Sequence, residues 1–195
     1  MEENPNEIPK FYHDDDFMDS GDARPLRILS EYFGPLNRFK KFNVDDTIVF
    51  FGSARIKSEE EANAAMAEAK RTGEGLKKAE QMMRVCRYYE ETRQLAKRFT
   101  EWSKTLGDDE RRFVVCTGGG PGIMEAANRG ASEGKGINVG LNISLPFEQD
   151  ENPYITRELA LEFHYFFMRK FWFIYLAKAV LVMPGGLVRS MNFVN

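Results

Sequence analysis

The chain has 195 residues, of which 43% are hydrophobic and 29% charged, and its formal net charge of −3 gives no electrostatic support for nucleic-acid binding. The two cysteines, Cys86 and Cys116, have the spacing of neither a disulfide framework nor a metal site, and no signal peptide is visible. The longest apolar run is too short to span a bilayer, so we expect a cytoplasmic protein without a membrane partner or bound metal.

The N-terminal part divides into a polar tail and the first elements of a domain. Residues 1–22 are predicted to be a flexible tail, and residues 23–195 a single domain. Pro25 fits the first turn of a helix that is predicted to end near Gly34-Pro35. Residues 47–51 are continuously apolar and predict the first strand of a parallel sheet, buried on both faces.

A charged stretch follows at about residues 57–84 and looks like an insertion. Ser58 and Glu61 form a capping-box pattern that predicts a helix over 59–71, which residues 72–75 interrupt. A second helix is predicted to face the core with residues at helical spacing. These residues are Tyr88, Thr92, Leu95, Phe99, Trp102 and Leu106. The charged part is most simply a solvated helical excursion, and a partner-binding arm is the alternative.

The centre of the chain is a glycine-rich loop at residues 117–124, Thr-Gly-Gly-Gly-Pro-Gly-Ile-Met. A short apolar run at 111–116 predicts a strand before it, and residues 123–131 predict a helix after it. Such a turn collects free backbone N–H groups at the positive end of a helix dipole, which suits a phosphate. The alternative is a tight turn that binds nothing.

The remaining elements complete an alternating pattern. Strands are predicted at 136–141, 159–163 and 179–183, a loop at 146–154, and a largely buried helix at 165–177. The alternation predicts an α/β, Rossmann-like, doubly wound parallel sheet, with its ligand site at the carboxyl ends of the strands. Gly52-Ser53, Gly118–Gly120 and Gly185-Gly186 all follow predicted strands, so we expect these loops to converge.

Two familiar nucleotide motifs are absent. The dinucleotide fingerprint requires glycine where the chain has Ile123, and no Gly-Lys-Ser/Thr follows the glycines.

Arg169-Lys170 lies within an aromatic helix, where cations are costly unless an anion meets them. We interpret the Arg169 guanidinium as a fork that binds a phosphate or a carboxylate. The alternative is that the two cations extend to the surface or pair with Glu158 or Glu162. We assign no role to His164.

Several stretches together resemble the Lonely-guy (LOG) family, once mislabelled as lysine decarboxylases. They lie in family order between about Pro25 and Gly186. The stretches are residues 118–131, 51–55, 145–149, 152–154, 163–170 and 183–186.

The resemblance implies a Rossmann-like homodimer or larger oligomer that needs no cofactor. Such an enzyme hydrolyses the N-glycosidic bond of AMP or a cytokinin riboside 5′-monophosphate, releasing the free base and ribose 5-phosphate. Arg169 would be the catalytic arginine. The resemblance assigns substrate or phosphate binding to Ser53, Gly118, Gly119, Gly120, Gly122, Glu148, Asn152, Lys170, Gly185 and Gly186.

The chain departs from the family motif P-G-G-x-G-T-x-x-E after Gly186. Val188 and Arg189 replace the motif's glycine and threonine, and Asn192 stands where the catalytic glutamate is expected. The family's final helix and strands are expected to be missing, as in a truncated or frame-shifted product. We therefore expect impaired hydrolysis, with a non-catalytic nucleotide-binding subunit as the alternative. Pyridoxal-dependent decarboxylation has no support beyond the old label.

Overall fold

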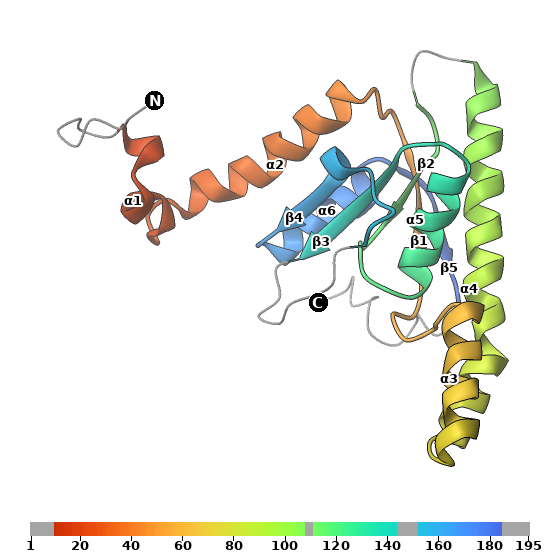
Figure 1. The fold of residues 1–195 in the computed structure, drawn as a ribbon. Coiled ribbons are helices and arrows are strands. Elements are labelled where there is room, and N and C mark those ends of the chain that lie inside the picture. The colour runs from red at the N-terminus through yellow and green to blue at the C-terminus, as the bar shows by residue number, and fades with distance from the viewer. Residues whose placement is uncertain (1–9, 108–110, 144–151, 185–195) are drawn as a thin grey trace, which may run out of the picture.

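The structure is a computed structural model, and it describes residues 10–107, 111–143 and 152–184. At its centre is a five-stranded sheet in which every strand pairing is parallel, with the order β4-β3-β2-β1-β5 (Figure 1). The strands are β1 (Thr47–Phe51), β2 (Val114–Thr117), β3 (Asn138–Ile143), β4 (Ala160–Phe163) and β5 (Ala177–Val182). The predicted α/β, Rossmann-like sheet is confirmed.

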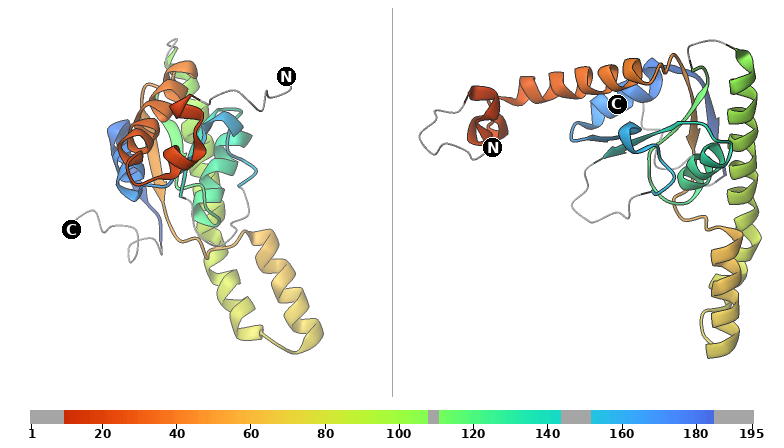
Figure 2. Two further views of the ribbon diagram at one scale, coloured as in Figure 1. Left: turned by 90° about the vertical axis from the view of Figure 1, so that its left-hand side faces the viewer. Right: turned by 45° about the horizontal axis from the view of Figure 1, so that its top comes forward.

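Helices cover both faces of this sheet, as Figures 1 and 2 show from several sides. The helices are α1 (Asp15–Asp19), α2 (Arg24–Lys41), α3 (Glu59–Thr72), α4 (Leu76–Ser103), α5 (Ile123–Glu133) and α6 (Phe166–Tyr175). Successive strand residues point to opposite faces. Val49 packs in the core beneath α2 and α6, whereas Ile48 and Phe50 pack in the core beneath α4 and α5. Among the described residues, no helix is long and apolar enough to cross a membrane.

The segment before α2 contains helical structure that the polar composition did not predict. Residues 11–13 form a 3₁₀ turn, and Asp14 caps α1 by accepting a hydrogen bond from the Phe17 N–H. The Arg27 guanidinium donates to the backbone oxygens of Met18 and Ser20. These charge-assisted bonds satisfy carbonyls at the end of α1 and tie it to α2.

Helix α2 does not end at Gly34-Pro35, so that prediction was wrong. It continues to Lys41 with Pro35 inside it. Proline has no N–H, and the helix therefore loses the bond that residue 35 would donate to the Glu31 carbonyl. The Trp172 indole N–H from α6 donates to that carbonyl instead, at 2.9 Å. A distant side chain thus compensates for the proline.

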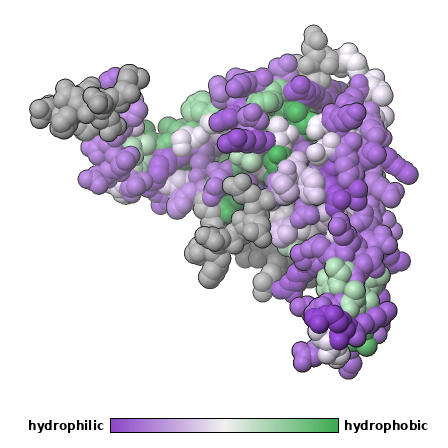
Figure 3. Space-filling model, viewed as in Figure 1, coloured by the Kyte–Doolittle hydropathy of each residue, from purple (hydrophilic) through white to green (hydrophobic). Residues whose placement is uncertain are grey.

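The charged stretch forms a helical hairpin of α3 and the first part of α4, which projects beyond the sheet (Figure 1). The predicted capping box at Ser58 and Glu61 is confirmed. Gly73 and Gly75 both have positive φ values (78° and 73°), which let the chain reverse between the two helices. Hydrophilic residues cover much of the exposed surface of α4 (Figure 3).

The prediction that six regularly spaced side chains between Tyr88 and Leu106 face the core was wrong in part. Trp102 and Leu106 are exposed, and Tyr88, Leu95 and Phe99 are only partly buried. The buried residues are mostly small: Ala79, Cys86, Tyr89, Thr92, Ala96 and Thr100. Small side chains are required because α5 approaches closely. A Cβ on Gly130 of α5 would lie only 2.0 Å from the Arg93 carbonyl oxygen.

Two further boundaries differ from the sequence predictions. Strand β2 begins at Val114 rather than at residue 111, because Phe113 has a positive φ of 54° and bends the chain. Buried Asp46 stabilises this bend by accepting hydrogen bonds from the Phe113 N–H and the Arg112 guanidinium. Helix α6 buries Met168, Trp172 and Phe173, whereas its other aromatic face is exposed. The prediction of a largely buried α6 was therefore wrong.

Candidate functional site

The loops after β1 and β2 meet closely at the carboxyl edge of the sheet. The Ile123 N–H donates to the Ser53 carbonyl at 3.1 Å. A Cβ on Gly122 would lie 2.4 Å from the same Ser53 oxygen, and one on Gly52 would collide with the Ile123 side chain. Gly122 also has a φ of 72°. Glycine is therefore required at both positions, and the convergence predicted for these two loops is confirmed.

Helix α5 begins directly behind the glycine loop and lacks a side-chain cap. Gly122 occupies the N-cap position and no side chain bonds to it. Within the loop, the Gly119 N–H donates to the Thr117 hydroxyl, and Ile123 uses its N–H on Ser53. The Ala126 N–H donates to the Gly122 carbonyl at 2.8 Å, so the Met124 and Glu125 N–H groups are the donors that α5 can offer to a cap or to an anion.

Asn142 is a site residue that our sequence reasoning missed. It lies near the end of β3, and its side chain packs directly on the backbone of Gly119, where an added Cβ would overlap its Oδ1 atom. Gly119 also has a φ of 72°, so both space and backbone conformation require glycine there. The signal available in the sequence was only a polar residue at the end of a predicted strand.

Arg169 reaches this edge from α6. Its Nε atom donates to the Leu141 carbonyl at 2.6 Å, and its Nη2 atom donates to the Gly118 carbonyl at 3.3 Å. The guanidinium also lies 5.1 Å from the Phe173 ring centroid. These contacts bring the glycine loop and the arginine together, as the sequence interpretation required.

The charge of Arg169 is not neutralised by a carboxylate among the described residues, since no ion pair there includes it. Burial lowers the pKa of Arg169 from its ordinary value. Burial also raises the pKa of the neighbouring Cys116 thiol to about 12, so this thiol is neutral at physiological pH. A partly desolvated cation with neutral neighbours favours an anionic ligand.

A chain of buried amides fixes the loop next to the site. Asn128 of α5 accepts from the Thr117 hydroxyl at 2.6 Å and donates to the Asn138 side chain at 2.8 Å. Asn152 donates to Asn128 at 3.1 Å and accepts from the Tyr154 N–H. The Asn152 amide therefore links the segment after residue 151 to α5 and, through Thr117, to the glycine loop.

Among the other predicted site residues, Lys170 lies in the described part of the chain and several others do not. The Lys170 ammonium lies 4.8 Å from the Phe166 ring centroid. Glu148, Gly185, Gly186 and Asn192 lie outside the described residues. Among the residues that the structure does describe, no group of three or more His, Cys, Asp or Glu side chains could hold a metal ion.

A separate hollow of about 320 Å³ lies at the opposite, amino-terminal edge of β2 and β3 and is lined by several cations. Lys104 donates there to the Gly134 carbonyl, and Arg111 donates to the Phe42 carbonyl. Cations at helix C-termini complement the helix dipole. These side chains therefore have structural partners, and the glycine-loop edge remains the better candidate site.

The fold and the site together define the chain as a Rossmann-like α/β protein with a glycine-rich loop at the carboxyl ends of its strands. A profile of the SLOG cluster4 family matches residues 90–187, which is half of the chain and includes the glycine loop and Arg169. The chain belongs to this family, whose superfamily includes LOG-like proteins and points to a nucleotide-related function. No curated protein matches the chain.

Proposed function

We propose that the chain binds the 5′-phosphate of a nucleoside monophosphate, AMP or a cytokinin ribotide, at the glycine-loop edge. The glycine loop and the first turn of α5 would supply backbone N–H donors, and Ser53 would lie beside the nucleotide. Family membership supports a nucleotide-related ligand. The reaction that fits best is hydrolysis of the N-glycosidic bond to the free base and ribose 5-phosphate.

One observation supports this proposal more strongly than any other. The Arg169 guanidinium bonds to the Gly118 carbonyl at 3.3 Å and has no carboxylate partner among the described residues. Two of its five N–H donors are used in the two carbonyl bonds. The remaining donors and the charge suit a phosphate or a leaving group that becomes anionic.

Hydrolysis also needs a carboxylate to stabilise an oxocarbenium-like transition state or to orient water. Asn192 stands where the resemblance places that carboxylate, and an amide cannot supply its charge. We therefore propose that turnover by this chain is weak. A non-catalytic nucleotide-binding subunit is the second candidate, and the asparagine is the observation that favours it.

The test combines binding and turnover. Calorimetry should detect AMP binding by the wild-type chain, and chromatography of the same mixture should detect little adenine. Arg169→Met should weaken binding by roughly tenfold or more, since a bond to a charged group contributes about 1.5–3 kcal/mol. Arg157→Met, an exposed cation in the turn before β4, is the matched control. Equal AMP affinity in all three proteins would contradict the proposal.

We also propose a homodimer or larger homo-oligomer. The aromatic face of α6 supports it, because Phe166, Phe167, Ile174 and Tyr175 are each more than 50% exposed. Several large apolar side chains exposed on one helix favour association. Sedimentation equilibrium would show a mass above 22.4 kDa if the proposal is correct, and a monomer at all concentrations would contradict it.

A further inference from the structure

Two helices in this chain begin with the same spacing of cap and glutamate, but their glutamates behave differently. In α3, Glu61 lies three residues after the N-cap and accepts a hydrogen bond from the N-cap Ser58 N–H at 3.1 Å. In α5, Glu125 lies three residues after the N-cap Gly122. In a capping box, a glutamate at this position accepts a hydrogen bond from the N-cap N–H of its own helix.

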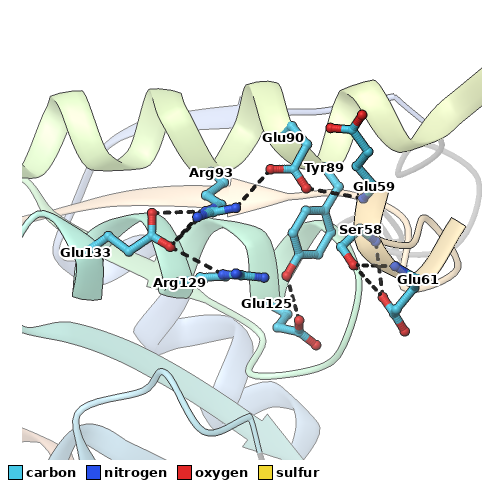
Figure 4. Close-up of polar contacts among 9 residues, drawn as sticks. All are labelled: Ser58, Glu59, Glu61, Tyr89, Glu90, Arg93, Glu125, Arg129 and Glu133. Carbon is cyan, nitrogen blue, oxygen red and sulfur yellow. Dashed lines mark hydrogen bonds and ion pairs between the residues drawn. The ribbon is translucent and has the colours of Figure 1, made fainter. Parts of the chain in front are cut away.

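Glu125 does not fold back. Its carboxylate accepts a hydrogen bond of 2.6 Å from the Tyr89 hydroxyl, which extends from α4 (Figure 4). Among the described residues, no other hydrogen bond to the Glu125 carboxylate is present. The first turn of α5 consequently has neither a side-chain cap nor a carboxylate over its N–H groups.

Tyr89 is well suited to hold this position. Its side chain is only 1% exposed and packs with Ile123 and Ala126 of α5. Burial, and then the hydrogen bond to Glu125, raise the pKa of Tyr89 above its ordinary value, so the hydroxyl keeps its proton and remains a donor.

The charged side chains around this contact also pair with one another, and the Arg129 guanidinium interacts with the Tyr89 hydroxyl as well. Arg93 forms ion pairs with Glu133 at 2.6 Å and with Glu90 at 3.0 Å, and Arg129 forms one with Glu133 at 3.3 Å (Figure 4). Glu90 in turn accepts from the Glu59 N–H at the start of α3. This network fixes α4 against α5 and thereby fixes the Tyr89 hydroxyl opposite Glu125.

We propose that Tyr89 is a positioning residue that holds the Glu125 carboxylate away from the N-terminus of α5, and so reserves those N–H groups for a phosphate monoester. The inference rests on the proposed function, because the phosphate would occupy the same N–H groups. Without the tyrosine hydroxyl, we expect the Glu125 carboxylate to turn toward the N–H of the N-cap Gly122, the group that corresponds to the Ser58 N–H bonded by Glu61. Its negative charge then competes with the ligand for the N–H donors and repels the phosphate.

Two measurements on the full chain test this assignment. The first uses no ligand: amide hydrogen exchange at Gly122, the N-cap of α5, compared between wild type and Tyr89→Phe. We expect slower exchange at this N–H in Tyr89→Phe, because the folded-back carboxylate accepts a hydrogen bond from it. In Tyr89→Phe/Glu125→Ala the exchange should return to the wild-type rate, since the competing carboxylate is gone. Unchanged exchange in Tyr89→Phe would overturn the inference, whatever the ligand proves to be.

The second measurement is calorimetric titration with ribose 5-phosphate. Tyr89→Phe should bind roughly threefold to tenfold more weakly than wild type, and Tyr89→Phe/Glu125→Ala should recover at least wild-type affinity. Tyr88→Phe is the matched control, because the Tyr88 hydroxyl accepts from Arg87 and lies on the same helix. A double variant as weak as Tyr89→Phe would show a general packing defect and overturn the assignment. Absence of binding by wild type would instead contradict the proposed function, and the exchange experiment would still decide the role of Tyr89.

Discussion

The contact between α4 and α5 predicts that Gly130→Ala destabilises the protein. An alanine Cβ at this position would lie 2.0 Å from the Arg93 carbonyl oxygen and 3.1 Å from the Ala96 Cβ. Ordinary contacts begin at 3.4 Å, so the two helices would have to separate by about 1.4 Å (3.4 − 2.0) at this point. Neither close atom can rotate away, because one is backbone and the other is a Cβ.

The expected change in the free energy of unfolding of Gly130→Ala is the sum of contributions with opposite signs. Alanine improves helix propensity by about 1 kcal/mol over glycine. Overpacking costs about 1–3 kcal/mol, and a gap of ~0.5–1 Å already loses a quarter to a half of each dispersion contact along the helix interface. The separation would also stretch the 2.6 Å bond between Tyr89 and Glu125. We expect a net loss of about 1–2 kcal/mol in the free energy of unfolding.

Urea denaturation, monitored by far-UV circular dichroism, measures this loss. Gly134→Ala is the matched control, because its Cβ would meet the Thr100 side chain at 3.1 Å, a smaller overlap, and its φ of −71° suits alanine. The control should change the free energy of unfolding by less than about 1 kcal/mol. If Gly130→Ala is as stable as wild type, α4 and α5 do not approach as closely as the structure has them.

Three further predictions concern other contacts. Trp172→Phe should cost about 2–4 kcal/mol in thermal or urea unfolding, because it removes the indole donor of the Glu31 carbonyl as well as buried volume. Asp46→Asn should cost about 2–3 kcal/mol by the same assay; this is less than for a fully buried ion pair because the Arg112 side chain is 37% exposed. Partial burial alone would raise the pKa of Glu61, but hydrogen bonds from Lys57 and the Ser58 N–H hold it below its ordinary value of 4.5. The stability difference between wild type and Glu61→Gln should therefore be present above pH 4.5 and disappear as the pH falls through the lowered pKa, and equal differences at pH 7 and pH 3 would contradict this.

The strands and the glycine loop could be predicted because their signals are local. Continuous β-branched runs mark β1 and β2, and glycines mark the points where backbone approaches backbone, as at Gly122 and Ser53. The proximity of Arg169 to Gly118 was expected from the family resemblance, which places the arginine and the glycine loop in one site. The Ser58 capping box was likewise visible in four consecutive residues.

The failures have a common physical cause, which is that partners distant in sequence decided the outcome. Helix α2 continues through Pro35 because Trp172, 141 residues beyond Glu31, supplies the missing donor. Close approach of Gly130 of α5 to Arg93 and Ala96 favours small buried side chains on that part of α4, which the periodicity of the large residues did not reveal. Asn142 escaped notice because its role depends on the Gly119 backbone in the loop after β2, a different part of the chain. Single-sequence periodicity contains none of this information.

Pro35 also has a consequence for anyone who engineers this chain. A mid-helix proline is an obvious candidate for replacement, and alanine there would restore a regular ladder within α2. The restored N–H would then compete with the Trp172 indole for the Glu31 carbonyl, their shared acceptor. A stiffer α2 would thus come with a more loosely attached α6, the helix that presents Arg169. Replacing Pro35 would therefore exchange firm attachment of the helix that carries Arg169 for a more regular α2. A measurement of melting temperature alone would not separate these two effects.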